Sequence, residues 1–158
     1  MSYIKIWVHT IWATKNREPV LVKKIRKPLF KHIRENGLKK NIYIDFINGY
    51  KEHVHCLFSL NSEESIAKSI QLIKGESSFW INKEKILPDK FEWQDEYFAV
   101  SVCESKLNMV REYIKNQEQH HQNVSFQDEY GNFIKKYGFN YKDPGAIMAT
   151  PAVRRQTI

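Results

Sequence analysis

The stretch NIYIDFINGYKEHVHCLFSL, residues 41–60, decides the fold that the sequence predicts. It holds two runs of alternating apolar residues, separated by a turn over 49–52. Because neighbouring side chains of a strand point to opposite faces, both runs are typical of strands, and together they predict a hairpin. In the second run, His53 and His55 share one face, and the other face is formed by Val54, Cys56, Phe58 and Leu60. The hairpin therefore predicts a sheet with an apolar core side and an opposite side that carries two histidines.

The patterns on both sides of the hairpin give the order of the elements. They predict strands over 3–12, 41–48, 53–60 and 97–103, with helices over 22–36, ending at Gly37, and 61–84, capped by Ser62. Two more helices are expected, one from Ser105 to about His121 and one over 126–137. The first six elements follow the β-α-β-β-α-β order of the ferredoxin-like (RRM-like) split βαβ plan. The predicted fold class is α+β: a four-stranded antiparallel sheet with helices on one face and an added C-terminal helix that carries Tyr113.

The size and charge of the chain narrow the classes of function. Its 158 residues are most naturally one folded domain, and a hydrophobic content of 42% is too high for a disordered chain. Twenty-five basic and 18 acidic residues give a net charge of +7, which favours a polyanionic partner, either nucleic acid or a membrane surface. The chain has no apolar run long enough for a membrane helix, no signal-peptide pattern, and only two cysteines, Cys56 and Cys103. We therefore expect a cytoplasmic protein that does not enter a membrane.

The histidine pair has two interpretations. Each imidazole could form local hydrogen bonds in the core, or the two could chelate a metal ion, because imidazole is a common ligand and the pair shares one face. Two ligands do not complete a site, and candidates for a third are Cys103, His9, His32 and the segment 111–121. A cysteine with two histidines would indicate structural zinc. Cys56, however, points to the wrong face by alternation.

The helix expected over 105–121 offers another third ligand. Tyr113 and Gln117 lie at the border of its apolar stripe, one turn and about 6 Å apart along the axis. These two residues could simply form the rim of a packed helix. Together with the two histidines, however, the Gln117 amide oxygen makes a donor set that suits Mg²⁺ or Mn²⁺ and leaves positions for phosphate oxygens and water. Tyr113 would then stand beside the metal as a nucleophile.

Several motifs together resemble a known superfamily. His53-Val54-His55 followed by YIKNQ (113–117) is similar to the HUH endonucleases, and within them to the single-tyrosine transposases of insertion sequences and their REP-associated relatives. Further segments that resemble this branch are HTIWATKNREPVL (9–21), KGESSFWIN (74–82), FEWQDEYFAVSV (91–102) and QDEYGNFIKKYGF (127–139). The resemblance covers about residues 3–139. We therefore expect one transposase domain over 1–139 and a tail over 140–158 of unknown role.

The resemblance implies a specific reaction and specific partners. Tyr113 would attack a phosphate of single-stranded DNA and leave a 5′-phosphotyrosine and a free 3′-hydroxyl, with Mg²⁺ or Mn²⁺ held by His53, His55 and Gln117. Members of the branch recognise subterminal hairpins and act as homodimers, so the expected partners are a hairpin-bearing single strand and a second copy of the chain. The expected DNA contacts are Lys15, Arg17 and Lys74 to phosphate, and Trp80 to a base unless it belongs to the core.

Two other functions remain open. The same fold could serve a domesticated protein that binds single-stranded or hairpin DNA without transposition, although the residues expected to act in cleavage are all present. A metal phosphoesterase that hydrolyses RNA ends through paired histidines needs two His-x-Ser/Thr motifs, and the chain has no such pair. A covalent tyrosine adduct would distinguish the transposase from both alternatives.

Overall fold

The computed structural model describes residues 2–139, which form two compact units. The first unit, residues 2–118, contains a sheet and the helices that pack on it. The second unit, residues 119–139, contains α5 (Phe126–Lys136), the helix predicted over 126–137. The predicted tail over 140–158 lies outside the described residues. Between residues 2 and 139, no helix is long and apolar enough to cross a membrane.

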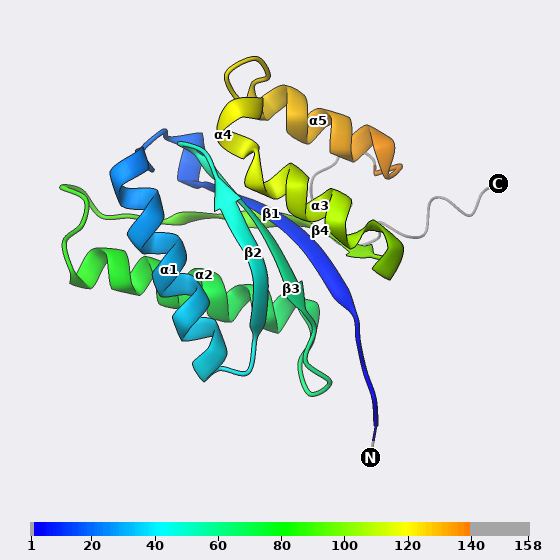
Figure 1. Ribbon diagram of the computed structural model, residues 1–158. Coiled ribbons are helices and arrows are strands. Elements are labelled where there is room, and N and C mark those ends of the chain that lie inside the picture. The colour runs from blue at the N-terminus through cyan, green and yellow to red at the C-terminus, as the bar shows by residue number, and fades with distance from the viewer. Residues whose placement is uncertain (1, 140–158) are drawn as a thin grey trace. The chain divides into compact units, whose positions relative to one another are not determined.

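The first unit is built on one antiparallel sheet (Figure 1). Its strands are β1 (Trp7–Thr14), β2 (Tyr43–Gly49), β3 (His53–Ser59) and β4 (Trp93–Val102), in the order β2-β3-β1-β4. Helix α1 (Lys23–Lys39) connects β1 to β2, and α2 (Ile66–Lys83) connects β3 to β4. The element order and the four-stranded antiparallel sheet confirm the predicted α+β, ferredoxin-like fold.

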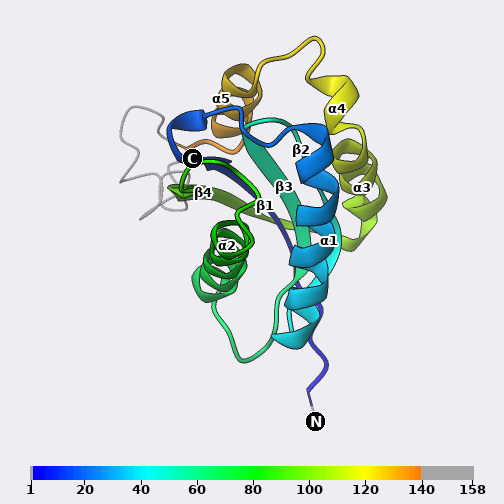
Figure 2. The same ribbon diagram turned by 90° about the vertical axis from the view of Figure 1, so that its left-hand side faces the viewer.

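Helices α1 and α2 cover one face of the sheet (Figure 2), and the larger hydrophobic core lies between them and the strands. Trp12 of β1 meets Trp93 of β4 edge to face, with ring centroids 5.8 Å apart. The helices contribute Ile25, Leu29, Ile33, Ile70, Ile73 and Ile81, and β3 contributes Val54, Cys56 and Phe58. The apolar face predicted for the second strand of the hairpin is therefore the core side, as expected.

The opposite face of the sheet carries helix α3 (Leu107–Lys115) and the histidines. A smaller apolar cluster joins α3 to this face and consists of Trp7, Leu57, Leu107 and Ile114. Because side chains alternate along β3, His53 and His55 project from the same face as Leu57. The structure thus confirms that the two histidines point away from the core residues of their own strand.

Helix α1 is longer than predicted. It passes through Gly37, the expected end, and stops at Lys39. Gly37 is required inside the helix, because a Cβ there would lie 2.9 Å from the carbonyl oxygen of Ile42. Pro28 also lies inside the helix and is exposed. The glycine therefore marks a close approach between α1 and the chain that enters β2, and it does not end the helix.

Helix α2 starts later than predicted. Its N-cap is Ser65, whose hydroxyl accepts a hydrogen bond from the Lys68 amide at 3.0 Å, and not Ser62. The residues before it form a separate turn, in which the Glu63 amide donates to the Asn61 side chain at 2.8 Å. This local side-chain hydrogen bond competes with helical geometry and keeps the segment out of the helix.

Three strands also begin at other residues than predicted, and among them β2 begins at Tyr43 rather than Asn41. β1 begins at Trp7 rather than Tyr3, because the apolar residues before Trp7 are exposed. β4 begins at Trp93 rather than Tyr97, and Trp93 pairs with Thr14 beyond an irregularity in the register. The longer β4 places the Trp93 side chain in the larger core.

The continuous helix predicted over 105–121 is divided into three elements. They are the 3-10 turn η2 (Glu104–Lys106), α3, and α4 (Gln117–His120). Asn116, between α3 and α4, leaves helical geometry with φ −94° and ψ 19°. The break therefore falls between Tyr113 and Gln117, the two residues of the predicted site on this segment.

Candidate active site

The histidine pair lies on β3, a central strand of the sheet. His53 pairs with Ala13 of β1 and His55 with Ile11, so both side chains project from the face that carries α3. Their rings meet edge to face with centroids 5.2 Å apart, and one nitrogen of each lies within 4.8 Å of the other. Both side chains are buried. This spacing allows one ion to contact both rings.

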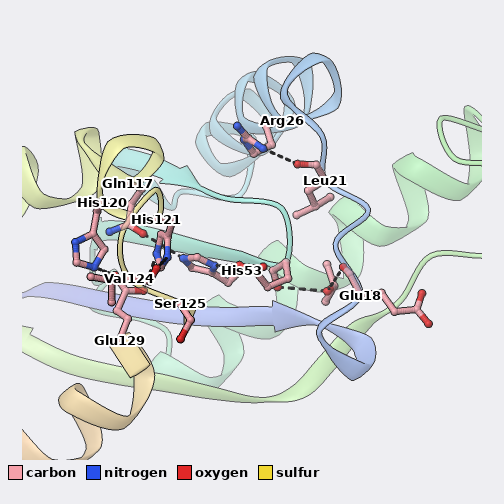
Figure 3. A network of polar contacts seen from close by, with 12 residues as sticks. Glu18, Leu21, Arg26, His53, Gln117, His120, His121, Val124, Ser125 and Glu129 are labelled. Atoms are coloured by element: carbon pink, nitrogen blue, oxygen red, sulfur yellow. Dashed lines mark hydrogen bonds and ion pairs between the residues drawn. The ribbon is translucent and has the colours of Figure 1, made fainter. Parts of the chain in front are cut away.

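Gln117 adds an oxygen beside the pair. Its Oε1 lies 3.1 Å from Nε2 of His53, and Figure 3 shows the amide pointing toward that ring. The amide nitrogen donates to the Tyr113 carbonyl oxygen at 3.4 Å, which is consistent with the oxygen facing the histidine. Two atoms that bind one Mg²⁺ at right angles, each at about 2.1 Å, lie roughly 3 Å apart. The observed separation therefore suits a shared ion.

The surroundings of His53 favour a cation. Its Nδ1 contacts the Glu52 carboxylate at 2.7 Å, and its Nε2 contacts the Gln117 amide oxygen. Both neighbours are acceptors, whereas a neutral imidazole has one N–H and one lone pair. When the His53 proton is on Nδ1 and is donated to Glu52, the Nε2 lone pair faces the Gln117 oxygen, which is another acceptor, and a positive ion at that point would stabilise both. Two imidazoles and one amide oxygen thus fit a divalent metal.

Tyr113 lies next to the second histidine. Its ring centroid is 5.6 Å from that of His55 and 6.5 Å from that of His9. The tyrosine is half-buried and Gln117 is buried, which agrees with a position at the border of a packed helix face. The structure therefore brings together all four residues predicted for catalysis and metal binding.

Asn48 of β2 holds α3, the helix that carries Tyr113, in this position. It pairs with His55 across the sheet, and its Nδ2 donates to the carbonyl oxygens of Ile114 and Lys115, both at 3.0 Å. These carbonyls lie at the end of α3, where helical carbonyls lack their usual partners. The amide of Asn48 thus stabilises the break that precedes Gln117, and sequence reasoning did not single it out.

Two ion pairs add to this attachment. Arg111 of α3 donates to the Asp45 carboxylate of β2 at 2.6 Å, and this contact raises the pKa of the Arg111 guanidinium. Glu118, directly after Gln117, lies 3.4 Å from the Lys23 ammonium of α1. The segment that carries Tyr113 and Gln117 is therefore held by polar contacts along its length.

The hairpin is tight beside the histidines. Gly49 ends β2 opposite Val54, and a Cβ on Gly49 would collide with the carbonyl oxygen of His53. The Tyr50 amide donates to that same carbonyl oxygen at 3.1 Å and closes the turn. Only a residue without a side chain fits here, so the backbone of His53 is fixed from the side of β2.

The other candidate third ligands have different positions. His9, on β1, contacts Nδ1 of His55 through its own Nε2 at 3.0 Å, and the two rings stack. His32 lies on α1, on the core side of the sheet, and Cys103 is exposed directly after β4. The structure therefore places Gln117 beside the histidine pair and gives His9 a contact with one of its members.

His120 and His121 share a carboxylate within the second unit. Nε2 of His121 lies 3.2 Å from Oε1 of Glu129, and Nε2 of His120 lies 3.2 Å from Oε2 of the same residue. Nδ1 of His121 contacts the carbonyl oxygen of Val124 at 2.7 Å. Sequence reasoning did not single out Glu129, because a turn and the start of α5 separate it from the histidines and no periodic pattern links them.

Two of the cations expected to contact DNA have partners in the protein. Lys15 pairs with Glu92 at 3.0 Å. Lys74 donates to the main-chain oxygens of Gln94 and Asp95 at 2.5 and 3.0 Å, and burial lowers the pKa of its ammonium. A phosphate that contacts either lysine would compete with these groups.

The other two residues expected to contact DNA are Trp80, which packs against the core, and Arg17, which lies in a turn. Trp80 stacks on His32 with ring centroids 4.2 Å apart and packs against the larger core, which agrees with the core alternative for this residue. Arg17 lies in the turn η1 (Lys15–Arg17) with a φ of 54°, in the left-handed region. In the turn directly after β1, the chain thus carries an arginine whose backbone has a left-handed conformation.

Comparison with known proteins assigns the family. The family model described as "Transposase IS200 like" matches residues 2–117. The chain belongs to this family of transposases. The matched region ends at Gln117 and includes the histidine pair and Tyr113. Membership makes the chain a DNA-cleaving enzyme of the transposase class.

Solved structures agree with this assignment. A protein of Deinococcus radiodurans described as a transposase matches with a TM-score of 0.57 and 25% identity, over 73% of this chain and 93% of that one. A REP-associated tyrosine transposase bound to a REP hairpin matches with a TM-score of 0.56 and 18% identity, over 78% and 73% of the two chains. The second likeness shows a common fold. No curated protein matches the chain significantly.

Proposed function

We propose that this IS200-like transposase cleaves and rejoins single-stranded DNA through a covalent bond to Tyr113, with a divalent metal held by His53, His55 and Gln117. The observation that supports this is the convergence of the four side chains on one face of the sheet. The two histidines come from β3, and the other two residues come from a segment that β2 attaches to that face.

The proposed step is a displacement at phosphorus. The Tyr113 oxygen forms a bond to a backbone phosphorus as the bond from that phosphorus to the 3′ oxygen of the preceding nucleotide breaks. The phenol loses its proton, and the departing oxygen takes up a proton to become a free 3′-hydroxyl. No water is consumed, so the 5′-phosphotyrosine retains the energy of the broken bond. Attack by a 3′-hydroxyl in the reverse direction rejoins the strand.

The metal and the helix have separate tasks. A bound Mg²⁺ or Mn²⁺ supplies Lewis-acid polarisation of the phosphate. Tyrosine is a weak nucleophile with an ordinary pKa of about 10, so its attack depends on a fixed position close to the phosphate. Asn48 of β2 binds the end of α3, and Arg111 of α3 binds a carboxylate of β2. In the proposed mechanism these two contacts hold Tyr113 in its position.

The proposed substrate is a single strand with a hairpin near the cleavage point. A protein of the same fold is bound to a REP hairpin, and the net charge of +7 favours a polyanion. Affinity should fall steeply with salt, because phosphate contacts release counterions. The motif supplies one nucleophile per chain, so joining two strand ends takes two copies, and we propose a homodimer built from the domain over 1–139.

A denaturing gel tests the proposal. Labelled hairpin-bearing single strands are incubated with wild type or Tyr113→Phe in Mg²⁺ or Mn²⁺. We expect a protein-linked band for wild type and none for the variant, whose folding and DNA binding should be unchanged. Tyr97→Phe, on β4, is the matched control and should form the adduct. Cleavage without a linked band, or a linked band in Tyr113→Phe, would remove Tyr113 from this role, and binding without any cleavage would indicate a DNA-binding protein.

A further inference from the structure

Both histidines of the proposed metal site have a partner at the same ring nitrogen. Nδ1 of His53 contacts Oε1 of Glu52 at 2.7 Å, and Nδ1 of His55 contacts Nε2 of His9 at 3.0 Å. Nε2 is then the ligand nitrogen of each ring, and in His53 this atom lies 3.1 Å from the Gln117 amide oxygen. A histidine binds a metal through one nitrogen, and the hydrogen bond at the other decides which.

We infer that Glu52 and His9 are positioning residues that set the tautomers of His53 and His55. This inference rests on the proposed function, because the tautomers matter only if the histidines bind a metal. In the inferred arrangement Glu52 accepts the Nδ1 proton of His53. His9 accepts the Nδ1 proton of His55 when its own proton is on Nδ1. Each Nε2 atom then already carries the lone pair that binds an ion, which removes the cost of moving protons between nitrogens on binding.

The backbone of Glu52 is fixed in a way that suits this role. Its carbonyl oxygen accepts hydrogen bonds from the Thr14 amide at 2.9 Å and the Thr14 hydroxyl at 3.3 Å. The carbonyl oxygen of the preceding Lys51 accepts from the Leu21 amide at 2.9 Å. The turn before β3 is thus tied to the end of β1 and to the start of the chain that leads into α1. The Glu52 carboxylate therefore extends from a rigid point toward the neighbouring ring.

Glu52 and His9 differ in how strongly their hydrogen bonds fix the tautomer of the neighbouring histidine. Glu52 is a charged acceptor, and a charge-assisted hydrogen bond to a ligand histidine raises the basicity of the ligand nitrogen. His9 is an imidazole, so either ring of the His9–His55 pair can be the donor, and this pair sets its tautomer less strongly. We therefore expect His53 to be the better ordered ligand and Glu52 to have the larger effect on metal affinity.

Imidazole NMR of the metal-free protein tests the tautomers directly. Long-range ¹H–¹⁵N spectra in the presence of a chelator distinguish the Nδ1–H from the Nε2–H form of each histidine. Wild type should show His53 as Nδ1–H, and Glu52→Ala should shift it to Nε2–H. Calorimetric titration with Mn²⁺ should then show a loss of affinity of about 10–100-fold for Glu52→Ala. Glu52→Gln, which keeps an acceptor oxygen without the charge, should fall between wild type and Glu52→Ala.

Glu92→Ala is the matched control, since Glu92 is an acid directly before β4 that pairs with Lys15. It should change neither the His53 tautomer nor the Mn²⁺ affinity. A Glu52→Ala protein that keeps the Nδ1–H form of His53 and wild-type affinity overturns the inference and leaves the proposed function intact. Equal losses of affinity in Glu52→Ala and Glu92→Ala also overturn it, because they indicate a general charge effect. A wild-type protein that binds no Mn²⁺ contradicts the proposed function itself.

Discussion

The two faces of the sheet are built from the same strands but differ in the side chains that they bury. The face under α1 and α2 is an extensive apolar core, in which burial raises the pKa of the Cys56 thiol far above its ordinary range. The face under α3 has a small apolar cluster, and beside it the imidazoles of His9, His53 and His55 are buried among one another. Along β3 the two environments alternate residue by residue.

This difference separates the sources of stability and of chemistry. A fully buried large apolar side chain contributes roughly 1.5–3 kcal/mol through the area it removes from water. A buried polar side chain costs free energy unless it is hydrogen-bonded, so the histidines add little net stability even with their partners. The larger core therefore stabilises the fold for both faces, and the face under α3 can hold side chains chosen for their chemistry.

The strongest test of this separation is a pair of neighbouring substitutions in β3. His55→Ala should abolish cleavage and leave most DNA affinity, because phosphate contacts elsewhere carry that affinity. Val54→Ala, one residue away on the core side, should lower the free energy of unfolding and leave cleavage per folded molecule nearly unchanged. Cleavage gels and denaturant titrations of both variants give the answer. Wild-type cutting by His55→Ala in Mg²⁺ would refute the role of the histidine face.

The size of the core contribution can be measured at Phe58. Phe58→Ala should lower the free energy of unfolding by about 3–5 kcal/mol, because it leaves a cavity in a fully buried site. Phe79→Ala, on the exposed side of α2, should change it by less than about 0.5 kcal/mol. Urea unfolding followed by tryptophan fluorescence measures both values. Equal effects of the two variants would show that the face under α1 and α2 is not the main source of stability.

A smaller effect on stability and on cleavage is expected from Asn48, the residue of β2 that holds α3. Asn48→Ala removes two hydrogen bonds to the end of α3, so the free energy of unfolding should fall by about 1–2 kcal/mol. Adduct formation should slow roughly tenfold, which corresponds to about 1.4 kcal/mol in the barrier. Single-turnover kinetics with the hairpin substrate measure the rate.

Asn36→Ala is the matched control, because the Asn36 amide contacts Lys40 at the end of α1. It should leave the rate of adduct formation unchanged. If Asn48→Ala forms the adduct as fast as this control does, the contact of Asn48 with α3 has no part in placing Tyr113.

The sequence predicted the two faces well because their signal is local. Alternation in 53–60 assigns each side chain of β3 to a face without knowledge of its neighbours, and the structure confirms this assignment. Helical spacing placed Tyr113 and Gln117 one turn apart, and the contact between Gln117 Nε2 and the Tyr113 carbonyl oxygen agrees with that spacing despite the break. Their proximity to the histidines was predicted from the chemistry of the donor set and from the family resemblance, because spacing within one element cannot show that two elements meet.

The parts that were missed depend on contacts between distant residues. The break at Asn116 is stabilised by Asn48, which belongs to another element, so no pattern within 105–121 marks it. The contact of His9 with His55 requires the register of β1 against β3, which alternation alone does not give. The start of α2 depends on the competing turn at Asn61, where Ser62 and Ser65 are equally good caps by type.

Gly49 limits how this protein can evolve. A residue with any side chain at this position would push on the backbone of His53, so natural drift and laboratory libraries alike should return glycine there. The pattern Gly-x₃-His-x-His is therefore a more selective query for distant relatives of this hairpin than the histidine pair alone. Chains that keep both histidines but have lost this glycine are expected to be inactive copies of the transposase. Such copies are expected in genomes where the mobile DNA that encodes it has begun to decay.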